Sequence, residues 1–311
     1  MVTNTKEHSL LVEKYRSKDL SEYVGNEHIK KQIQKYLDQD DIQNFIFYGP
    51  AGTGKTTLAK IIVNNLECDY LYINSSDERG IETIRDKVTS FSSTVSFKKI
   101  KVVILDEADF LTIQAQASLR NVIETFSRST RFIMTCNFVE RIIDPLQSRC
   151  QVLKIVPPSK KEVAKHIKGI LDKETTKFEI DDLVNIVNKH HPDIRKMLNT
   201  IQLSTVNNEL VVDESILVSS NYIKNIIEEL KQKKTDFRKL RQIIADSQVR
   251  DFEELYRALF DHASEYAVGR EGSVAIILNE HQYHSNFRID KEVNISSALA
   301  KIIEIKKPQV I

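Results

Sequence analysis

Apolar and polar residues follow two different spacings along the first half of this chain. Short apolar runs, "NFIFYG", "YLYIN", "KVVILD", "RFIMTCN" and "VLKIV", have the length and composition of buried β-strands. Between them, stretches such as "IETIRDKVTSF" and "IQAQASLRNVIETF" repeat apolar residues at helical spacing. Because strands that alternate with helices form parallel sheets with helices on both faces, the pattern predicts an α/β domain.

The pattern changes at Pro157 and Pro158, where two prolines interrupt the chain. Beyond them the strand signal stops, and "KKEVAKHIKGIL", "DDLVNIVNKHH" and "DIRKMLNTIQL" predict a small helical domain. Segments such as "YIKNIIEELKQ" and "FEELYRALFDHA" predict a further, all-helical domain. We therefore expect a sheet domain over 1–157, a helical lid over 158–219 and a helical domain over 220–311.

The few glycines of the chain are concentrated in one place. There are eight in 311 residues, and three of them lie in "GPAGTGKTT", between a predicted strand and a predicted helix. This segment matches G-x-x-x-x-G-K-[ST], the loop whose backbone N–H groups and helix N-terminus bind phosphates. A chance glycine turn is the alternative, and the flanking elements argue against it. The predicted polyphosphate-binding residues are Gly49, Pro50, Ala51, Gly52, Thr53, Gly54, Lys55, Thr56 and Thr57, with Lys55 at the β- and γ-phosphates and Thr56 at Mg²⁺.

Two acidic residues end the strand "KVVILDEAD", downstream of the loop. Asp106 is predicted to hold Mg²⁺ through water, and Glu107 to polarise the water that attacks the nucleotide. Acids that simply begin a solvated helix are the alternative. Asn137 ends a further strand at the same predicted edge of the sheet, where ligands bind in open α/β sheets. Its amide is a candidate for orienting the water or sensing the γ-phosphate, although Asn is also a common strand terminator.

The overall composition excludes several classes of protein. Net charge is +1, so any DNA contact must come from a local basic patch. No apolar run approaches the length of a membrane span, and "MVTNTKEHSL" is not a signal peptide. The three cysteines form no C-x-x-C pair, which argues against a zinc module or a disulfide framework. We expect a soluble intracellular protein without membrane contact, in the host cytoplasm if viral and in the nucleus if eukaryotic.

Several stretches resemble one branch of the AAA+ ATPases. "LVEKYRSKDLSEYVGNEHI", "NSSDERGIETIRDKV", "NFVERIIDPLQSRC" and "PDIRKMLNTIQ" are similar to replication factor C small subunits, over about residues 10–205. The chain also resembles the ATPase subunit of T-even bacteriophage clamp loaders, whose compact length it shares. The resemblance implies an ATP hydrolase, using ATP and Mg²⁺, in a ring of about five clamp-loader subunits. Such a ring opens a sliding clamp and loads it on primer–template DNA. The DNA and the clamp together stimulate ATP hydrolysis.

The resemblance also implies roles for individual residues. Asn137 would be sensor 1, and Arg195 on the lid would be sensor 2, reaching the γ-phosphate of its own subunit's ATP. Arg149, in "SRC", would be the arginine finger that acts on ATP of the neighbouring subunit. A surface salt bridge is the alternative for Arg149, and an ordinary helix-surface arginine for Arg195. The adenine and ribose pocket would be lined by Val12, Glu13, Lys14, Tyr15, Arg16, Val24 and Gly25.

Contacts with DNA and the clamp are predicted from weaker signals. "DERGIETIR" places Arg79, Ile81 and Arg85 at a helix start, which suits a DNA phosphate. "SFKKIK" adds three lysines, for which a solvated loop is the alternative. Two phenylalanines around "FSSTVSF" are either a clamp-docking plug or part of the core. Two residues on the helix after the acidic pair either couple DNA contact to the ATP site or form a polar helix face. The three lysines are Lys98, Lys99 and Lys101, the two phenylalanines are Phe91 and Phe97, and the two helix residues are Gln116 and Arg120.

Two other functions remain open. One is another AAA+ DNA machine, such as a helicase loader or a Holliday-junction motor, which would lack clamp-stimulated, primer–template-dependent ATPase activity. The other is a non-hydrolysing structural subunit of the clamp-loader ring. The presence of Lys55, Glu107, Arg149 and Arg195 argues against that second possibility.

Overall fold

The computed structural model describes residues 10–211, 214–232, 234–247, 249, 252–285, 287 and 290–306. The chain divides into two units, Met1–Leu210 and Val211–Ile311, and each is described by itself. Within the described residues, no helix is both long enough and apolar enough to cross a membrane.

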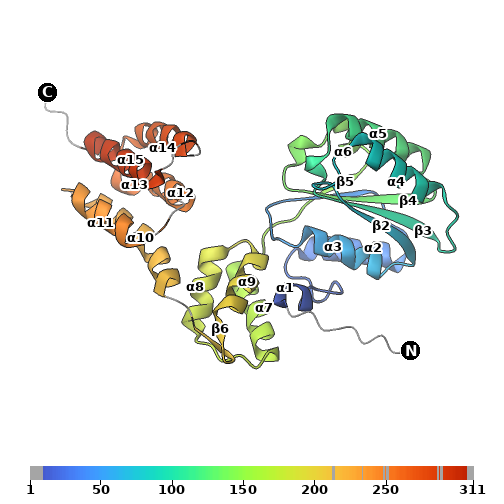
Figure 1. Cartoon of the computed structure of the whole chain (residues 1–311), viewed down its shortest axis with the longest axis horizontal. Helices are drawn as coiled ribbons and strands as arrows, with labels where there is room; N and C mark the ends of the chain where they lie inside the picture. The colour runs from blue at the N-terminus through green and yellow to red at the C-terminus, as the bar shows by residue number, and fades with distance from the viewer. Residues whose placement is uncertain are drawn as a thin grey trace. The chain divides into compact units, whose positions relative to one another are not determined.

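The first unit contains a five-stranded sheet in the order β2-β3-β4-β1-β5 (Figure 1). All its strand pairs are parallel. Every residue of β3 is buried, as expected for a central strand of a parallel sheet. Because the strands share one direction, the segments that follow β1, β3 and β4 all lie at the same edge. The strands are β1 (Phe45–Tyr48), β2 (Cys68–Asn74), β3 (Ile100–Asp106), β4 (Thr130–Cys136) and β5 (Gln151–Lys154).

Helices cover both faces of this sheet (Figure 1). On one face, Ile29 and Ile33 of a helix join Phe45 and Phe47 in a buried core. On the other, helices that include Ile84 pack on the opposite side of the strands in a second core. The predicted α/β fold is therefore confirmed. The first face carries α2 (Glu27–Asp38) and α3 (Lys55–Asn64), and the second α4 (Ile81–Ser93), α5 (Ile113–Thr125) and α6 (Asp144–Gln147); shorter helices are α1 (Leu11–Lys14), η1 (Ala108–Phe110) and η2 (Val139–Arg141).

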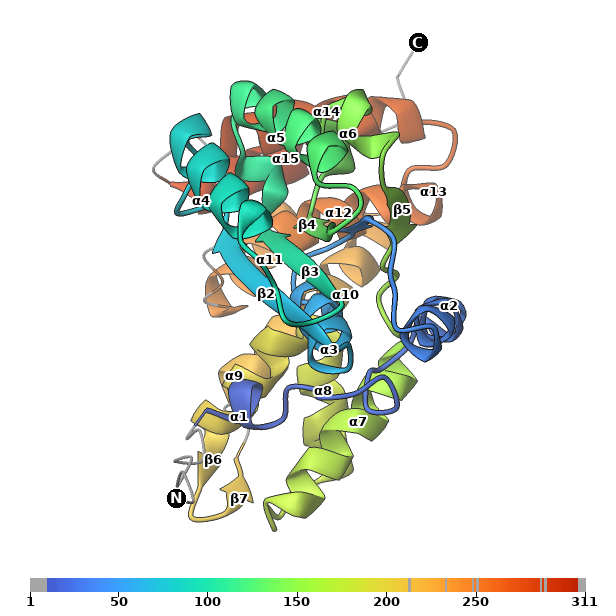
Figure 2. The same cartoon turned by 90° about the vertical axis from the view of Figure 1, so that its right-hand side faces the viewer.

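Three further helices of the first unit pack in sequence: α7 (Lys160–Lys173), α8 (Ile180–His190) and α9 (Ile194–Ser204) (Figure 2). Ser159 begins α7 with a capping box, in which its hydroxyl accepts from the backbone of Glu162 and the Glu162 carboxylate accepts in return. A small antiparallel hairpin follows, β6 (Thr205–Val206) and β7 (Glu209–Leu210). The expectation that strands end before residue 158 is wrong at this hairpin.

The described part of the second unit is helical. Its apolar core adjoins a buried hydrogen-bonded group in which Asn294 Nδ2 donates to the Tyr256 hydroxyl at 2.9 Å and to the His281 carbonyl at 2.7 Å. The unit begins at Val211, whereas the sequence placed a domain boundary after residue 219. The three-domain division stays a prediction. The helices are α10 (Glu214–Lys231), α11 (Phe237–Ser247), α12 (Glu253–Asp261), α13 (Ala263–Tyr266), α14 (Glu271–Ser285) and α15 (Lys291–Lys306).

Candidate nucleotide-binding site

The glycine-rich segment forms the turn from β1 into α3. Gly52 and Gly54 have φ of +73° and +92°, values that side-chain-bearing residues rarely adopt. A Cβ on Gly54 would lie 2.9 Å from Cε2 of Tyr23, and a Cβ on Gly52 would lie 2.0 Å from Oδ1 of Asp193. The loop therefore needs glycine at both positions, because of its backbone conformation and because other segments approach it closely.

Lys55 is the first residue of α3, and its ammonium group lies against the loop itself. Its Nζ donates to the carbonyls of Gly49 and Pro50 and to Oδ1 of Asn137, each at 2.8 Å. Lys55 is only 8% exposed, and this burial lowers its pKa; the positive charge of Arg195 acts in the same direction. An anion bound beside this ammonium would favour its charged form, which suits a phosphate site.

The acidic pair lies at the end of β3, next to the start of α3. Asp106 is buried, and its carboxylate accepts hydrogen bonds from the hydroxyls of Thr56 at 2.7 Å, Tyr72 at 2.7 Å and Thr135. Glu107 follows with φ of +55°, in the left-handed region. Thr56 and Asp106, the two predicted Mg²⁺ residues, are therefore in direct contact.

Asn137, directly after β4, is held by its backbone. The amide N–H groups of Asn137 and Phe138 donate to Oδ2 of Asp109 at 3.2 and 3.3 Å. Asp109 is 7% exposed and was not singled out from the sequence. Its carboxylate fixes the turn that directs the Asn137 side chain toward Lys55.

A cleft joins these groups, and it contains about 1020 Å³ of empty space including its mouth. Gly49 and Pro50 are not among its lining residues, although their carbonyls accept hydrogen bonds from Lys55. Glu13, Lys14 and Gly25 are not among its lining residues; Glu13 instead pairs with Arg16, and Lys14 pairs with Glu174 at 2.8 Å. The predicted residues that line the cleft are Val12, Tyr15, Arg16, Val24, Ala51, Gly52, Thr53, Gly54, Lys55, Thr56, Thr57, Asp106, Glu107, Asn137 and Arg195.

The cleft also contains residues that the sequence did not indicate. The Tyr23 hydroxyl donates to the Thr53 carbonyl at 3.3 Å, and its ring lies against Gly54. His166 of α7 lies in the wall, where burial lowers its pKa. The signal available in the sequence was the position of Tyr23 directly before Val24 and Gly25, which were predicted to line the adenine and ribose pocket. The additional lining residues are Ser17, Tyr23, Thr135, Cys136, His166, Ile194 and Leu198.

The donor set of the cleft fits ATP and Mg²⁺. The loop combines a buried ammonium with the N-terminus of α3, which suits a polyphosphate. One hydroxyl and one carboxylate, in contact with each other, suit a cation that also takes oxygen atoms from phosphate and water. No cluster of three or more His, Cys, Asp or Glu side chains is placed to hold a metal in the described residues. The contact between Thr56 and Asp106 fits a cation that arrives with the nucleotide.

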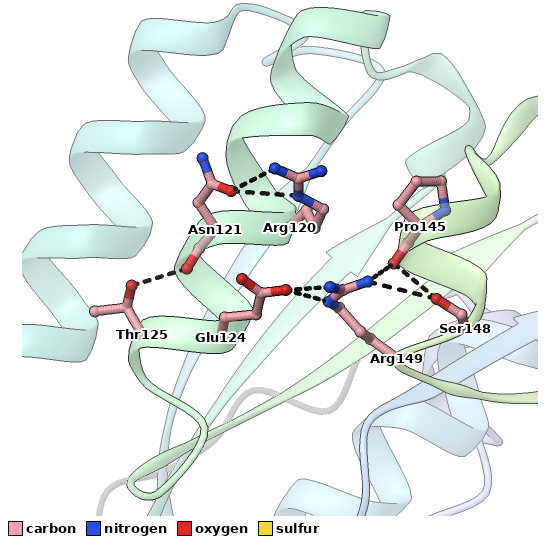
Figure 3. A network of polar contacts seen from close by, with 7 residues as sticks. All are labelled: Arg120, Asn121, Glu124, Thr125, Pro145, Ser148 and Arg149. Atoms are coloured by element: carbon pink, nitrogen blue, oxygen red, sulfur yellow. Dashed lines mark hydrogen bonds and ion pairs between the residues drawn. The ribbon is translucent and has the colours of Figure 1, made fainter.

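Arg149 lies outside this cleft, on the surface between α5 and β5. Its Nε donates to Oε1 of Glu124 at 2.8 Å, and its Nη2 contacts the same oxygen. Its Nη1 donates to the Pro145 carbonyl at 2.7 Å (Figure 3). The side chain is 33% exposed and Glu124 is 51% exposed. The guanidinium is therefore accessible and is not in contact with its own subunit's phosphate loop.

The predicted DNA residues fall into two separate sets. Arg79, Ile81 and Arg85 are exposed at the start of α4, near the carboxyl-terminal edge of the sheet. Lys98 and Lys99 precede β3, at the opposite edge, and lie 3.8 Å from Asp69 and 3.2 Å from Asp40 respectively. The structure does not bring the two sets together.

Lys101 does not belong to either set. It is 3% exposed, and its Nζ donates to the carbonyls of Phe91 and Thr94 and to the Thr94 hydroxyl. Its ammonium thus caps the C-terminal end of α4, where a positive charge is favourable. For Lys101, both DNA contact and a solvated loop are wrong, because the residue lies in β3 with its ammonium buried and hydrogen-bonded.

In each of the two remaining predicted pairs, the two residues lie in different environments. Phe91 packs partly buried against the core, whereas Phe97 is fully exposed. Gln116 is 1% exposed: its amide donates to the carbonyls of Leu111 and Arg141, and its oxygen accepts from the N–H of Ile143. The Gln116 side chain is buried and hydrogen-bonds three backbone groups, so the polar-face alternative is wrong for Gln116. Arg120 contacts the side chain of Asn121 on the same helix (Figure 3).

Comparison with known proteins agrees with the geometry. Residues 45–158 match the ATPase family associated with various cellular activities (AAA). The RuvB Holliday junction branch migration motor of Thermotoga maritima superposes with a TM-score of 0.54 at 18% identity, covering 81% of this chain and 80% of that one. At this identity the likeness concerns the fold alone. The fold and the phosphate loop together define an AAA-class ATPase domain.

Two relatives identify the family within this class. The replication factor C small subunit of Haloarcula marismortui is 40% identical over 211 residues, 66% of this chain and 64% of that protein. The replication factor C small subunit 1 of Pyrobaculum islandicum is 32% identical over 316 residues, 95% of this chain and 94% of that protein. The chain belongs to the replication factor C small subunit family. The resemblance seen in the sequence is confirmed.

Proposed function

We propose that this chain is an ATP-hydrolysing subunit of a sliding-clamp loader in DNA replication. In this proposal it acts in a ring of about five subunits, which opens the clamp and loads it on primer–template DNA. Hydrolysis is stimulated by DNA and the clamp. Residues 1–157 carry the nucleotide site, 158–219 form the lid and 220–311 form the collar of the ring. The relatives of the same family across nearly the whole chain favour this function over a Holliday-junction motor, whose likeness is limited to fold.

The residues of the cleft have distinct roles in this proposal. Lys55 and the loop bind the β- and γ-phosphates, while Thr56 and Asp106 hold Mg²⁺. When bound, Mg²⁺ neutralises phosphate charge as a Lewis acid. Glu107 orients the attacking water and accepts its proton, and Asn137 and Arg195 contact the γ-phosphate. The segment that includes Val12, Tyr15 and Val24 holds the adenosine.

The observation that carries the proposal is the position of Arg149. A guanidinium stabilises the charge that spreads over the transferred phosphoryl group, and a neighbouring subunit can supply it. Arg149 is accessible and lies outside its own subunit's cleft, whereas the other predicted catalytic groups lie inside it. This arrangement supports hydrolysis at an interface between two copies.

Mixing two variants tests this proposal. We expect Arg149→Ala to leave ATP binding nearly unchanged and to lower turnover of the assembled ring by on the order of 10² or more. Lys55→Ala should lose ATP binding but keep its finger. Equal amounts of the two should recover part of the activity, because one provides a working cleft and the other provides the finger.

Arg128→Ala, which removes an exposed arginine of the adjacent turn, is the matched control and should keep wild-type turnover. Each variant mixed with itself gives the baseline. Failure to recover activity on mixing, together with full activity in a verified monomer, would show that Arg149 does not act in trans.

A further inference from the structure

The two acids of the cleft are connected through a residue on the neighbouring strand. Thr135 is the penultimate residue of β4 and is 1% exposed. It lies one position beyond the register pair of Leu105 with Met134, so its side chain reaches the end of β3. Its hydroxyl donates to Oδ1 of Asp106 and accepts from the backbone N–H of Glu107 at 3.1 Å.

One hydroxyl can donate once and accept at two positions. The Thr135 hydroxyl uses both capacities, in opposite directions, so it contacts the carboxylate of one acid and the backbone of the next. Glu107 has φ of +55°, a conformation that is uncommon for any residue other than glycine. The contact with its N–H therefore supports a backbone geometry that the local sequence does not favour.

Two other hydroxyls contact Asp106, and neither has this double role. Thr56 donates to Oδ1 and Tyr72 donates to Oδ2, each at 2.7 Å. Their contacts orient the Asp106 carboxylate but do not extend to Glu107. Tyr72, on β2, therefore offers an internal comparison, since removing its hydroxyl affects one acid only.

We propose that Thr135 is a positioning residue of the hydrolytic site, acting through both Asp106 and Glu107. Its hydroxyl holds the Asp106 carboxylate in the orientation needed for Mg²⁺, and it fixes the backbone from which the Glu107 side chain extends toward the water. The inference rests on the proposed function, because it assigns a part to the same ATP-hydrolysing cleft. A hydroxyl that only satisfied buried polar groups would stabilise the fold without affecting Mg²⁺ binding or turnover.

Three variants separate these roles. Thr135→Val keeps the shape and removes the hydroxyl, Thr135→Ser keeps the hydroxyl, and Tyr72→Phe removes only the Oδ2 contact. Binding of a fluorescent ATP analogue is measured over a series of Mg²⁺ concentrations. Turnover is then measured in the assembled complex with saturating ATP and Mg²⁺.

We expect Thr135→Val and Tyr72→Phe both to raise the Mg²⁺ concentration for half-maximal binding, by about tenfold or more. Only Thr135→Val should also lower kcat, by about tenfold or more, because Glu107 loses its anchor. Thr135→Ser should resemble the wild type in both measurements. Binding of the analogue without Mg²⁺ should be equal in all four proteins.

A folded Thr135→Val protein with wild-type kcat would overturn the proposal, as would a kcat loss that Thr135→Ser shares in full. Thermal unfolding without nucleotide verifies the fold. If Thr135→Val does not fold, Thr135→Cys keeps a similar volume with a much weaker donor, and unchanged kcat there has the same meaning. Lys55→Ala is measured alongside: normal ATP binding in that variant would refute the nucleotide site itself, independently of Thr135.

Discussion

Lys55 and Arg149 are the two cations assigned to ATP hydrolysis, and their surroundings are opposite. Lys55 is buried, and its ammonium donates to three oxygen atoms of its own loop and of Asn137. Arg149 lies on the surface and pairs with Glu124, outside the cleft (Figure 3). The groups proposed to bind the nucleotide are thus assembled within one chain, whereas the group proposed to accelerate its cleavage is accessible to another chain.

The largest effect is expected when a reacting group is removed from the cleft and its binding groups are left in place. We expect Glu107→Gln to bind ATP with wild-type affinity, because size and polarity are preserved. Turnover should fall by about 10²–10⁴, since the amide cannot accept the proton of water. Calorimetric titration and single-turnover hydrolysis measure the two quantities. Glu67→Gln, at an exposed position, should change neither. Wild-type turnover in Glu107→Gln would remove this residue from its proposed role.

A second test extends the comparison to charges outside both sites. Arg85 is exposed and forms no ion pair among the residues that the structure describes, whereas Lys98 and Lys99 lie near Asp69 and Asp40. We expect Arg85→Ala to weaken DNA binding several-fold and to reduce the salt slope by about one phosphate contact. The double change of Lys98 and Lys99 to Ala should have a smaller effect, because the nearby acids already offset their charge.

The DNA measurement requires titrations at several salt concentrations, with basal ATPase activity followed in parallel. Lys31 and Lys35, both exposed on α2, provide the matched pair of control substitutions to Ala. If the slope is the same in the wild type, the Arg85 variant and the control, Arg85 belongs to the ordinary solvated surface.

The smallest expected effect concerns the fold around Arg149. Because both members of its ion pair with Glu124 are substantially exposed, we expect Glu124→Gln to change the free energy of unfolding by less than about 1 kcal/mol. Urea unfolding of the two proteins measures the difference. A loss above about 3 kcal/mol would mean that the pair is a structural element of the fold. That result would contradict the description of Arg149 as a surface group, in contrast to the buried Lys55.

The parts of the site that follow a local pattern could be predicted from the sequence. The phosphate loop, the acids that end β3 and the position of Asn137 after β4 all depend on short segments and on strand order. The fold class followed from the alternation of apolar runs with amphipathic ones. Even the hairpin of β6 and β7 had a local signal in the adjacent Asn207 and Asn208, because asparagine tolerates the positive φ that both residues adopt in this turn.

Other features depend on contacts between distant segments, and no short pattern encodes them. Thr135 reads as an ordinary strand residue, and its role depends on β3 lying beside β4. Gln116 and Lys101 have polar side chains that normally face solvent, but each is buried where several carbonyl groups need donors. Tyr23 reaches the phosphate loop only because two segments 30 residues apart in sequence lie against each other in the fold.

The position of Arg149 outside its own cleft has a genetic consequence. In the proposed ring, a chain altered at Arg149 keeps its fold and its nucleotide cleft, so it assembles as readily as the normal chain. The defect then appears in the next chain, whose own sequence is intact. Such an allele should be dominant when expressed with the wild-type copy, whereas an allele that prevents folding is excluded from the ring and should be recessive.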